Sequence, residues 1–154
     1  MKYLIAVFAL AFTFNAKAEI TGFVPSGHMP NQQEFSTADY GAFPSDYKTL
    51  IKDYMQIILK DPESARYTFS SPPKKGWNGS EGFGYIVCPL INAKNSFGGY
   101  GGNQLNYFMI QNGKITNAKY LHDRSIDDVI ASAINSLCTD KKYIAPDSTQ
   151  EQPK

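Results

Sequence analysis

Residues 84–102 read GYIVCPLINAKNSFGGYGG, and this stretch decides the fold of the chain. It opens inside an apolar strand that we expect to run from Phe83 to Ile91. Apolar side chains occupy alternate positions on both faces of this strand, which is typical of a strand covered on both sides. Pro89 has no backbone N–H to donate, so it marks a sheet edge or a bulge. The second half of the stretch is polar and glycine-rich, which predicts a loop.

The sequence around this strand predicts a single α+β domain over residues 44–144, with a small, mainly antiparallel sheet. One helix should begin near Ser45 and end before Pro62, because the residue before a proline avoids helical angles. A closing helix should begin at Ser125, which is a favourable N-cap. Its apolar residues recur at helical spacing and predict one buried stripe: Ile126, Val129, Ile130, Ala133, Ile134, Leu137 and Cys138.

Three other segments lack a clear period. Residues 19–43 read as an extended arm or loop whose apolar residues, Phe35 among them, can either dock in a groove or form a tail that faces a partner. Prolines and glycines over residues 72–79 predict a loop that carries Trp77. Residues 145–154 read as a flexible polar tail. Between the first helix and the 72–79 loop, a short strand is expected over residues 66–69.

A β-hairpin is the clearest local prediction. Asn112-Gly113 separates two alternating segments, and a type I′ turn needs positive φ at both of its central positions. A two-residue turn pairs Gln111 with Lys114 and Ile110 with Ile115. If that register continues along the hairpin, six side chains share one face, which we expect to be the more buried: Leu105, Tyr107, Met109, Thr116, Ala118 and Tyr120.

The N-terminus predicts a secretory signal peptide over residues 1–18. A lone basic residue, an apolar run from Leu4 to Phe14 and Ala16-Lys17-Ala18 follow its three-part pattern. The alternative is an uncleaved buried helix; the run is too short to span a bilayer. With 15 basic and 14 acidic residues the net charge is +1, which argues against a nucleic-acid partner. We therefore expect a periplasmic or secreted bacterial protein without a membrane span.

Cys88 and Cys138 are the chain's two cysteines. In an oxidising compartment a disulfide between them is the natural expectation. The alternative is a reactive or redox pair, but neither cysteine belongs to a Cys-x-x-Cys motif or has a cationic neighbour in sequence.

Two stretches together resemble a group of small exported bacterial proteins. One is Lys60-Asp61-Pro62-Glu63-Ser64-Ala65, and the other runs from Asn92 to Tyr100 as NAKNSFGGY. Members of that group are uncharacterised and many look like lipoproteins. The resemblance implies an exported, compact protein and brings no reaction with it. This chain differs from the group in having no lipidation cysteine.

The glycine-rich loop is the candidate binding site. Its polar residues can form a recognition patch: Asn92, Lys94, Asn95, Gly98, Gly99 and Tyr100. In the alternative interpretation, the asparagines satisfy the backbone of a tight connection. The loop lacks the Gly-Lys-Ser/Thr ending of a P-loop. No catalytic residue, metal site or cofactor is assigned.

These features favour a non-catalytic, exported binding module of the bacterial cell envelope, with an envelope protein or glycan as partner. One alternative is an envelope-acting hydrolase in which Asp123 orients His122 as a base, although no serine or cysteine is tied to that pair by a known spacing. Another is an inhibitor or exclusion factor directed against an incoming enzyme, phage or plasmid.

Overall fold

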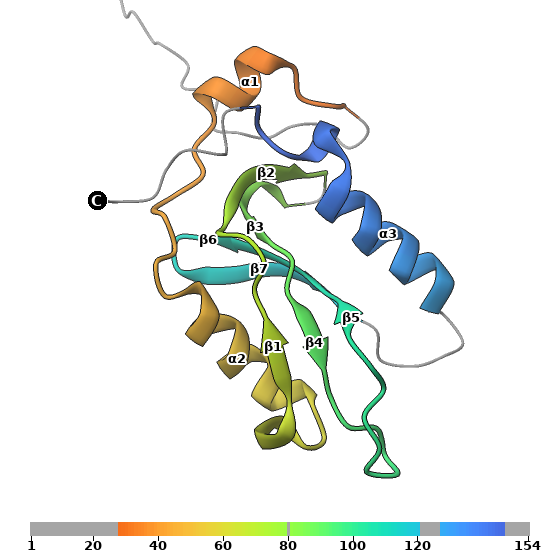
Figure 1. Ribbon diagram of the computed structural model, residues 1–154. Coiled ribbons are helices and arrows are strands. Elements are labelled where there is room, and N and C mark those ends of the chain that lie inside the picture. Colours follow the sequence, from red (N-terminus) through yellow and green to blue (C-terminus); the bar gives the residue numbers. More distant parts are fainter. Residues whose placement is uncertain (1–27, 80, 121–126, 147–154) are drawn as a thin grey trace, which may run out of the picture.

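The computed structural model describes residues 28–79, 81–120 and 127–146, which form helices and two antiparallel sheets (Figure 1). The predicted α+β class and the C-terminal helix are confirmed. The elements, with η for a 3-10 helix, are α1 (Gln32–Thr37), α2 (Tyr47–Ile58), η1 (Pro62–Ser64), β1 (Arg66–Thr68), β2 (Lys74–Asn78), β3 (Gly82–Val87), β4 (Leu90–Asn92), β5 (Gln104–Leu105), β6 (Tyr107–Gln111), β7 (Lys114–Lys119), α3 (Asp127–Thr139) and η2 (Lys141–Tyr143).

The central strand predicted over residues 83–91 is two strands that belong to different sheets. β3 lies in a four-stranded sheet of order β2-β3-β6-β7, and β4 lies in a three-stranded sheet of order β1-β4-β5. Pro89 separates them, since it cannot donate to a ladder. Its carbonyl accepts a hydrogen bond from Asn106 N at 3.0 Å, and Asn106 is the residue at which β5 passes into β6. The chain therefore crosses between the sheets twice at one place.

The hairpin turn is confirmed, but the predicted facing of its strands is wrong. Asn112 and Gly113 have φ values of 50° and 70°, and Ile110 pairs with Ile115 as expected. A register shift between Met109 and Ile110 then places Met109 opposite Asn117 instead of Thr116. Beyond this bulge Ala118 lies opposite Phe108. Both faces of β6 are fully buried, because the four-stranded sheet is covered on both sides.

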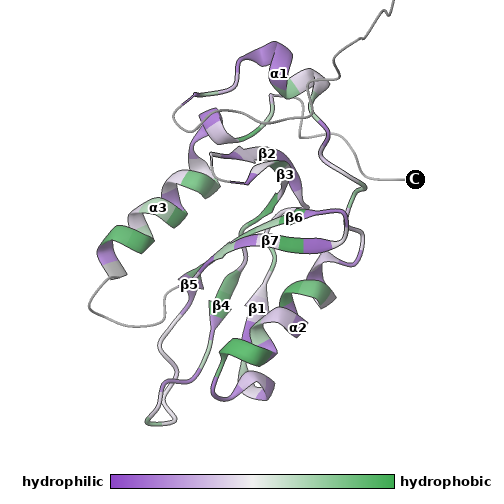
Figure 2. Ribbon diagram, turned by 180° about the vertical axis from the view of Figure 1, so that it is seen from behind, coloured by the Kyte–Doolittle hydropathy of each residue, from purple (hydrophilic) through white to green (hydrophobic). Residues whose placement is uncertain are grey.

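α2 and α3 cover the opposite faces of that sheet. Ile51 and Met55 of α2 pack against the face that carries Phe108 and Ile110. α3 packs against the other face, where its contacts with the sheet are made by Ile130, Ile134, Leu137 and Cys138 against Ile86, Tyr107 and Met109. Figure 2 shows hydrophobic and hydrophilic segments alternating along both helices, as expected for amphipathic helices.

The start of α2 and the exposure of one residue of α3 differ from their predictions. α2 begins at Tyr47, two residues after Ser45, and ends at Ile58. Val129 does not belong to the buried stripe of α3, since 73% of it is exposed. The predicted N-cap Ser125 and the apolar Ile126 lie outside the described residues. The Cys88–Cys138 disulfide is confirmed, with a Cα–Cα distance of 6.0 Å, and it joins α3 to the crossover between the sheets.

Residues 74–78, predicted to be loop, form strand β2. Gly76 lies opposite Gly84 in the ladder with β3, and it also forms an isolated bridge with Ile144. A Cβ on Gly76 would lie 2.7 Å from the backbone oxygen of Tyr143, so glycine here permits close approach of two backbones. Ala145, assigned to the tail, donates from its backbone N to Lys75 O at 2.9 Å. The pairing thus reaches one residue into the expected tail.

The predicted arm is not extended throughout. Asn31 and Glu34 form a capping box that begins helix α1, in agreement with the preference for Asn at this position. Phe35 and Tyr40 each make an edge-to-face contact with Phe83, at ring-centroid distances of 5.6 Å. The arm therefore docks on the domain through Phe35, while residues 19–27 lie outside the described part of the chain. None of the helices within the described ranges has the length and apolarity needed to cross a membrane.

Candidate functional site

The two stretches on which the resemblance rests lie against each other. Lys60–Ala65 follows α2, and the glycine loop, residues 92–102, connects β4 to β5 and projects beyond the sheets (Figure 1). Three polar contacts join them: Lys60 Nζ to Ser96 Oγ at 2.6 Å, Lys94 Nζ to Asp61 Oδ2 at 3.0 Å, and Tyr100 OH to the Ser64 carbonyl at 3.0 Å. The loop is therefore fixed to the segment that follows α2.

The asparagines of the predicted recognition patch hold the loop backbone. Asn95 Oδ1 accepts hydrogen bonds from the backbone N–H groups of Phe97 at 2.9 Å and Gly99 at 3.1 Å. Asn92 Oδ1 accepts one from Gly102 N at 3.1 Å. Gly98 has a φ of 80°, a conformation that glycine adopts without steric cost. Both asparagines therefore satisfy the loop backbone, and recognition of a ligand by the patch stays a prediction.

Tyr100 lies among cationic side chains. The Arg66 guanidinium is 4.5 Å from the centre of its ring and Lys94 Nζ is 5.8 Å from it, both within cation–π range. The hydrogen bond from Lys94 holds the pKa of the Asp61 carboxyl below its usual range. In turn, Asp61 raises the pKa of Lys94. Lys94 therefore stays protonated, and the Asp61 carboxylate compensates its charge locally.

We expect the Asp61 carboxyl, followed by NMR against pH, to titrate below the ordinary aspartate pKa of about 3.9. Because its pKa is lower in the folded than in the unfolded chain, the ionised carboxyl stabilises the fold above the unfolded-state pKa. This stabilisation is lost as the pH falls through the folded-state pKa. In Lys94→Gln the Asp61 pKa should rise toward its ordinary value. Lys114→Gln, a change at an exposed hairpin lysine, is the control, and an unchanged Asp61 titration in Lys94→Gln would contradict the pairing.

A pocket of about 410 Å³ lies between the end of α2 and the glycine loop, within the size range of small-ligand sites. Its apolar lining comes from Met55, Ile58, Leu59, Ile91 and Ala93. Its polar lining comes from Lys60, Lys94, Asn95, Ser96, Gln104 and Asn106. Sequence reasoning identified Lys94 and Asn95 but not Gln104 or Asn106. Lys60 belongs to the first of the two stretches on which the resemblance rests, and this was the sequence signal that could have identified it.

The remaining predicted residues lie around this pocket rather than in it. Gly98, Gly99 and Tyr100 are exposed on the loop, and the wall of the pocket also includes Gly101. Phe97 at the loop tip is 97% exposed and does not line the pocket. The loop thus presents an apolar tip outside and amide and ammonium groups inside.

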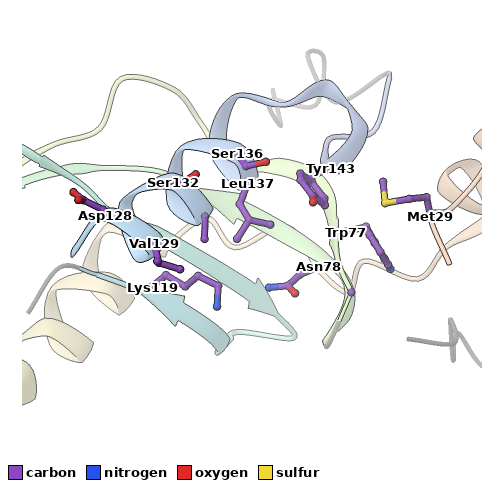
Figure 3. A pocket seen from close by; sticks show the side chains of 12 residues that line it. Met29, Trp77, Asn78, Lys119, Asp128, Val129, Ser132, Ser136, Leu137 and Tyr143 are labelled. Atoms are coloured by element: carbon purple, nitrogen blue, oxygen red, sulfur yellow. The ribbon is translucent and has the colours of Figure 1, made fainter. Parts of the chain in front are cut away.

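A second, larger groove of about 710 Å³ lies beside α3 (Figure 3). Val129, Ser132 and Ser136 of α3 line one side, and Asn78 and Lys119 lie across from them. Trp77 stacks on Tyr143 with ring centroids 6.1 Å apart, and its buried Nε1 has no acceptor among the described residues. Gly79 and Asp128 also line this groove.

The histidines add no site to the described structure. His28 Nε2 lies 3.2 Å from Glu34 Oε2 beside the α1 capping box. His122 and Asp123, on which the hydrolase alternative depends, lie outside the described residues. Across residues 28–79, 81–120 and 128–146, no cluster of three or more His, Cys, Asp or Glu side chains could hold a metal ion.

No protein-family model matches the chain, and no curated protein or solved structure matches it significantly.

Proposed function

We propose that this protein is a non-catalytic, exported binding module that binds an envelope glycan in the pocket between α2 and the glycine loop. The observation that carries the proposal is the construction of this pocket. It is lined in part by a loop whose backbone is held by Asn92 and Asn95, and its lining includes several amide and ammonium groups. Such preorganised polar groups in a pocket that also has apolar lining are typical of ligand sites.

Export is part of the same proposal. The predicted signal peptide and the Cys88–Cys138 disulfide support it, because disulfides persist mainly in oxidising compartments. A glycan is the partner that the pocket favours over a protein. Sugar hydroxyl groups both donate and accept hydrogen bonds, which suits amides such as Asn95 and Gln104. The C–H face of a sugar ring suits the apolar side chains of Met55 and Ile91, which also line the pocket.

Cosedimentation with purified peptidoglycan sacculi tests the proposal. The oxidised chain should sediment with the sacculi, and Asn95→Ala should lower the bound fraction several-fold, since the loop loses two hydrogen bonds and the pocket loses an amide. Asn103→Ala is the matched control, because Asn103 is exposed just beyond the loop and does not line the pocket. Protein that stays in the supernatant would sink the proposal. Release of soluble fragments from the sacculi would favour the hydrolase alternative.

A second candidate is the inhibitor or exclusion factor, and Phe97 favours it. An aromatic side chain that is 97% exposed on a fixed loop is a typical anchor for a protein interface. A change at Phe97 distinguishes glycan binding in the pocket from binding of a protein at the loop tip. Phe97→Ala should leave sacculus binding unchanged if the pocket binds the glycan, whereas a protein interface centred on the loop tip would be lost.

A further inference from the structure

We infer that the pocket between α2 and the glycine loop takes an acidic sugar unit, with its anionic group at Lys60. This inference rests on the proposed function and specifies its ligand. It is carried by three features of the pocket: the charge of its lining, the partners that each charged group already has, and the presence of both apolar and amide side chains in that lining.

The charged lining of the pocket is cationic only. Lys60 and Lys94 line it, whereas no carboxylate among the described residues does so. The two ammonium groups are not equivalent. Lys94 is paired with Asp61 at 3.0 Å, so much of its charge is already compensated. Lys60 donates to the neutral Ser96 hydroxyl at 2.6 Å, and no acidic side chain in the described part of the chain pairs with it. Lys60 therefore supplies the uncompensated positive charge at the rim.

The position of Lys60 makes it suitable for an anion. An ammonium group has three N–H donors and no acceptor, so the bond to Ser96 leaves donors for a ligand. The same bond ties the end of α2 to the loop and restricts the side chain before a ligand arrives. A preorganised donor loses less conformational entropy on binding. An anionic oxygen placed there would make a charge-assisted hydrogen bond, which is stronger than a neutral one.

The rest of the pocket favours a sugar over a free ion. Its volume of about 410 Å³ is far larger than an inorganic anion needs, and its lining includes the apolar side chains of Met55, Ile58 and Ile91, which a free ion would not use. Gln104 supplies an amide group for hydroxyl or acetamido substituents. Asn95 supplies its amide N–H donors, since its Oδ1 already accepts from the loop backbone. One anionic group, several hydroxyls and an apolar ring face together describe an acidic sugar.

Isothermal titration of the oxidised chain tests this with probes that differ in charge. N-acetylmuramic acid and N-acetylglucosamine differ by a carboxylate-bearing ether, and glucosamine 6-phosphate N-acetylated at C2 carries a phosphate instead. We expect the two acidic probes to bind at least about tenfold more tightly than the neutral one, as a charged hydrogen bond implies. The preference should shrink as salt is raised. Carboxylate and phosphate probes together show which anionic source the site prefers.

Variants of Lys60 provide the decisive comparison. Lys60→Gln should abolish the preference for acidic over neutral probes, measured as the ratio of their affinities, while Lys60→Arg should retain that preference. Lys114→Gln, which removes an exposed hairpin lysine, should behave as wild type. Equal binding of acidic and neutral probes by wild type would overturn this inference while leaving the glycan-binding proposal intact. Absence of binding to every probe and to sacculi would overturn both.

Discussion

Breaking the Cys88–Cys138 disulfide is expected to lower the free energy of unfolding by roughly 4 kcal/mol. The two cysteines are 50 residues apart in the chain, and the chain-entropy model gives about this loss for a loop of that length. Small domains are stable by only about 5–15 kcal/mol, so the loss removes a large share of the total. Urea unfolding of the oxidised chain and of the Cys88→Ser/Cys138→Ser variant would measure it.

The position of α3 gives the disulfide a second consequence. The helix is held on the sheet mainly through Ile134 and Leu137, while the side that faces the larger groove carries small residues such as Ser132 and Ala133. We therefore expect amide exchange in α3 to accelerate more than in α2 when the link is broken. Wild type unfolded in reductant is the control for the serine side chains. Equal midpoints and slopes for oxidised and reduced chains would contradict the prediction.

Local sequence patterns predicted the elements whose formation depends on a few adjacent residues. The turn at Asn112-Gly113 followed from the conformations that these two residues accept. The helices followed from apolar spacing, and the disulfide followed from the presence of two cysteines in a chain predicted to be exported. The short strand over residues 66–69 was also confirmed, as Arg66–Thr68.

The errors arose where distant pairing decides the outcome. Pro89 ends one strand and starts another only because Asn106 meets it there and carries the chain back across the sheets. The register shift between Met109 and Ile110 leaves no local mark, since alternation alone favours a regular ladder. Gly76 resembled a loop residue because its role depends on the close approach of Tyr143.

The candidate site was predicted only in part for the same reason. Lys94 and Asn95 belong to a polar loop that is conspicuous in the sequence, so they were identified. Gln104 and Asn106 contribute because β5 returns beside β4, and Lys60 contributes because α2 ends against the loop. The positions of Gln104 and Asn106 depend on tertiary contacts that no local pattern encodes, and the motif that contains Lys60 does not indicate which segment it contacts.

Phe108→Ala is expected to lower the free energy of unfolding by about 3–5 kcal/mol, the usual cost of removing a fully buried phenylalanine. Phe108 is 0% exposed and its ring contacts that of Tyr54 edge to face at 5.9 Å. Truncation would leave a cavity under α2, because Ile51 and Met55 of that helix are anchored in the same cluster. Chemical unfolding monitored by circular dichroism would measure the change.

Phe97→Ala is the matched control, because the same side chain is removed from a site that is 97% exposed. Its free energy of unfolding should stay within about 0.5 kcal/mol of wild type, since the ring gains almost no burial on folding. The contrast bears on function. If Phe97→Ala is as stable as wild type, any partner that it fails to bind was held by the ring itself and not by the fold. A loss comparable to that of Phe108→Ala would instead mean that Phe97 is buried in solution, as it would be in a contact between two copies of the chain.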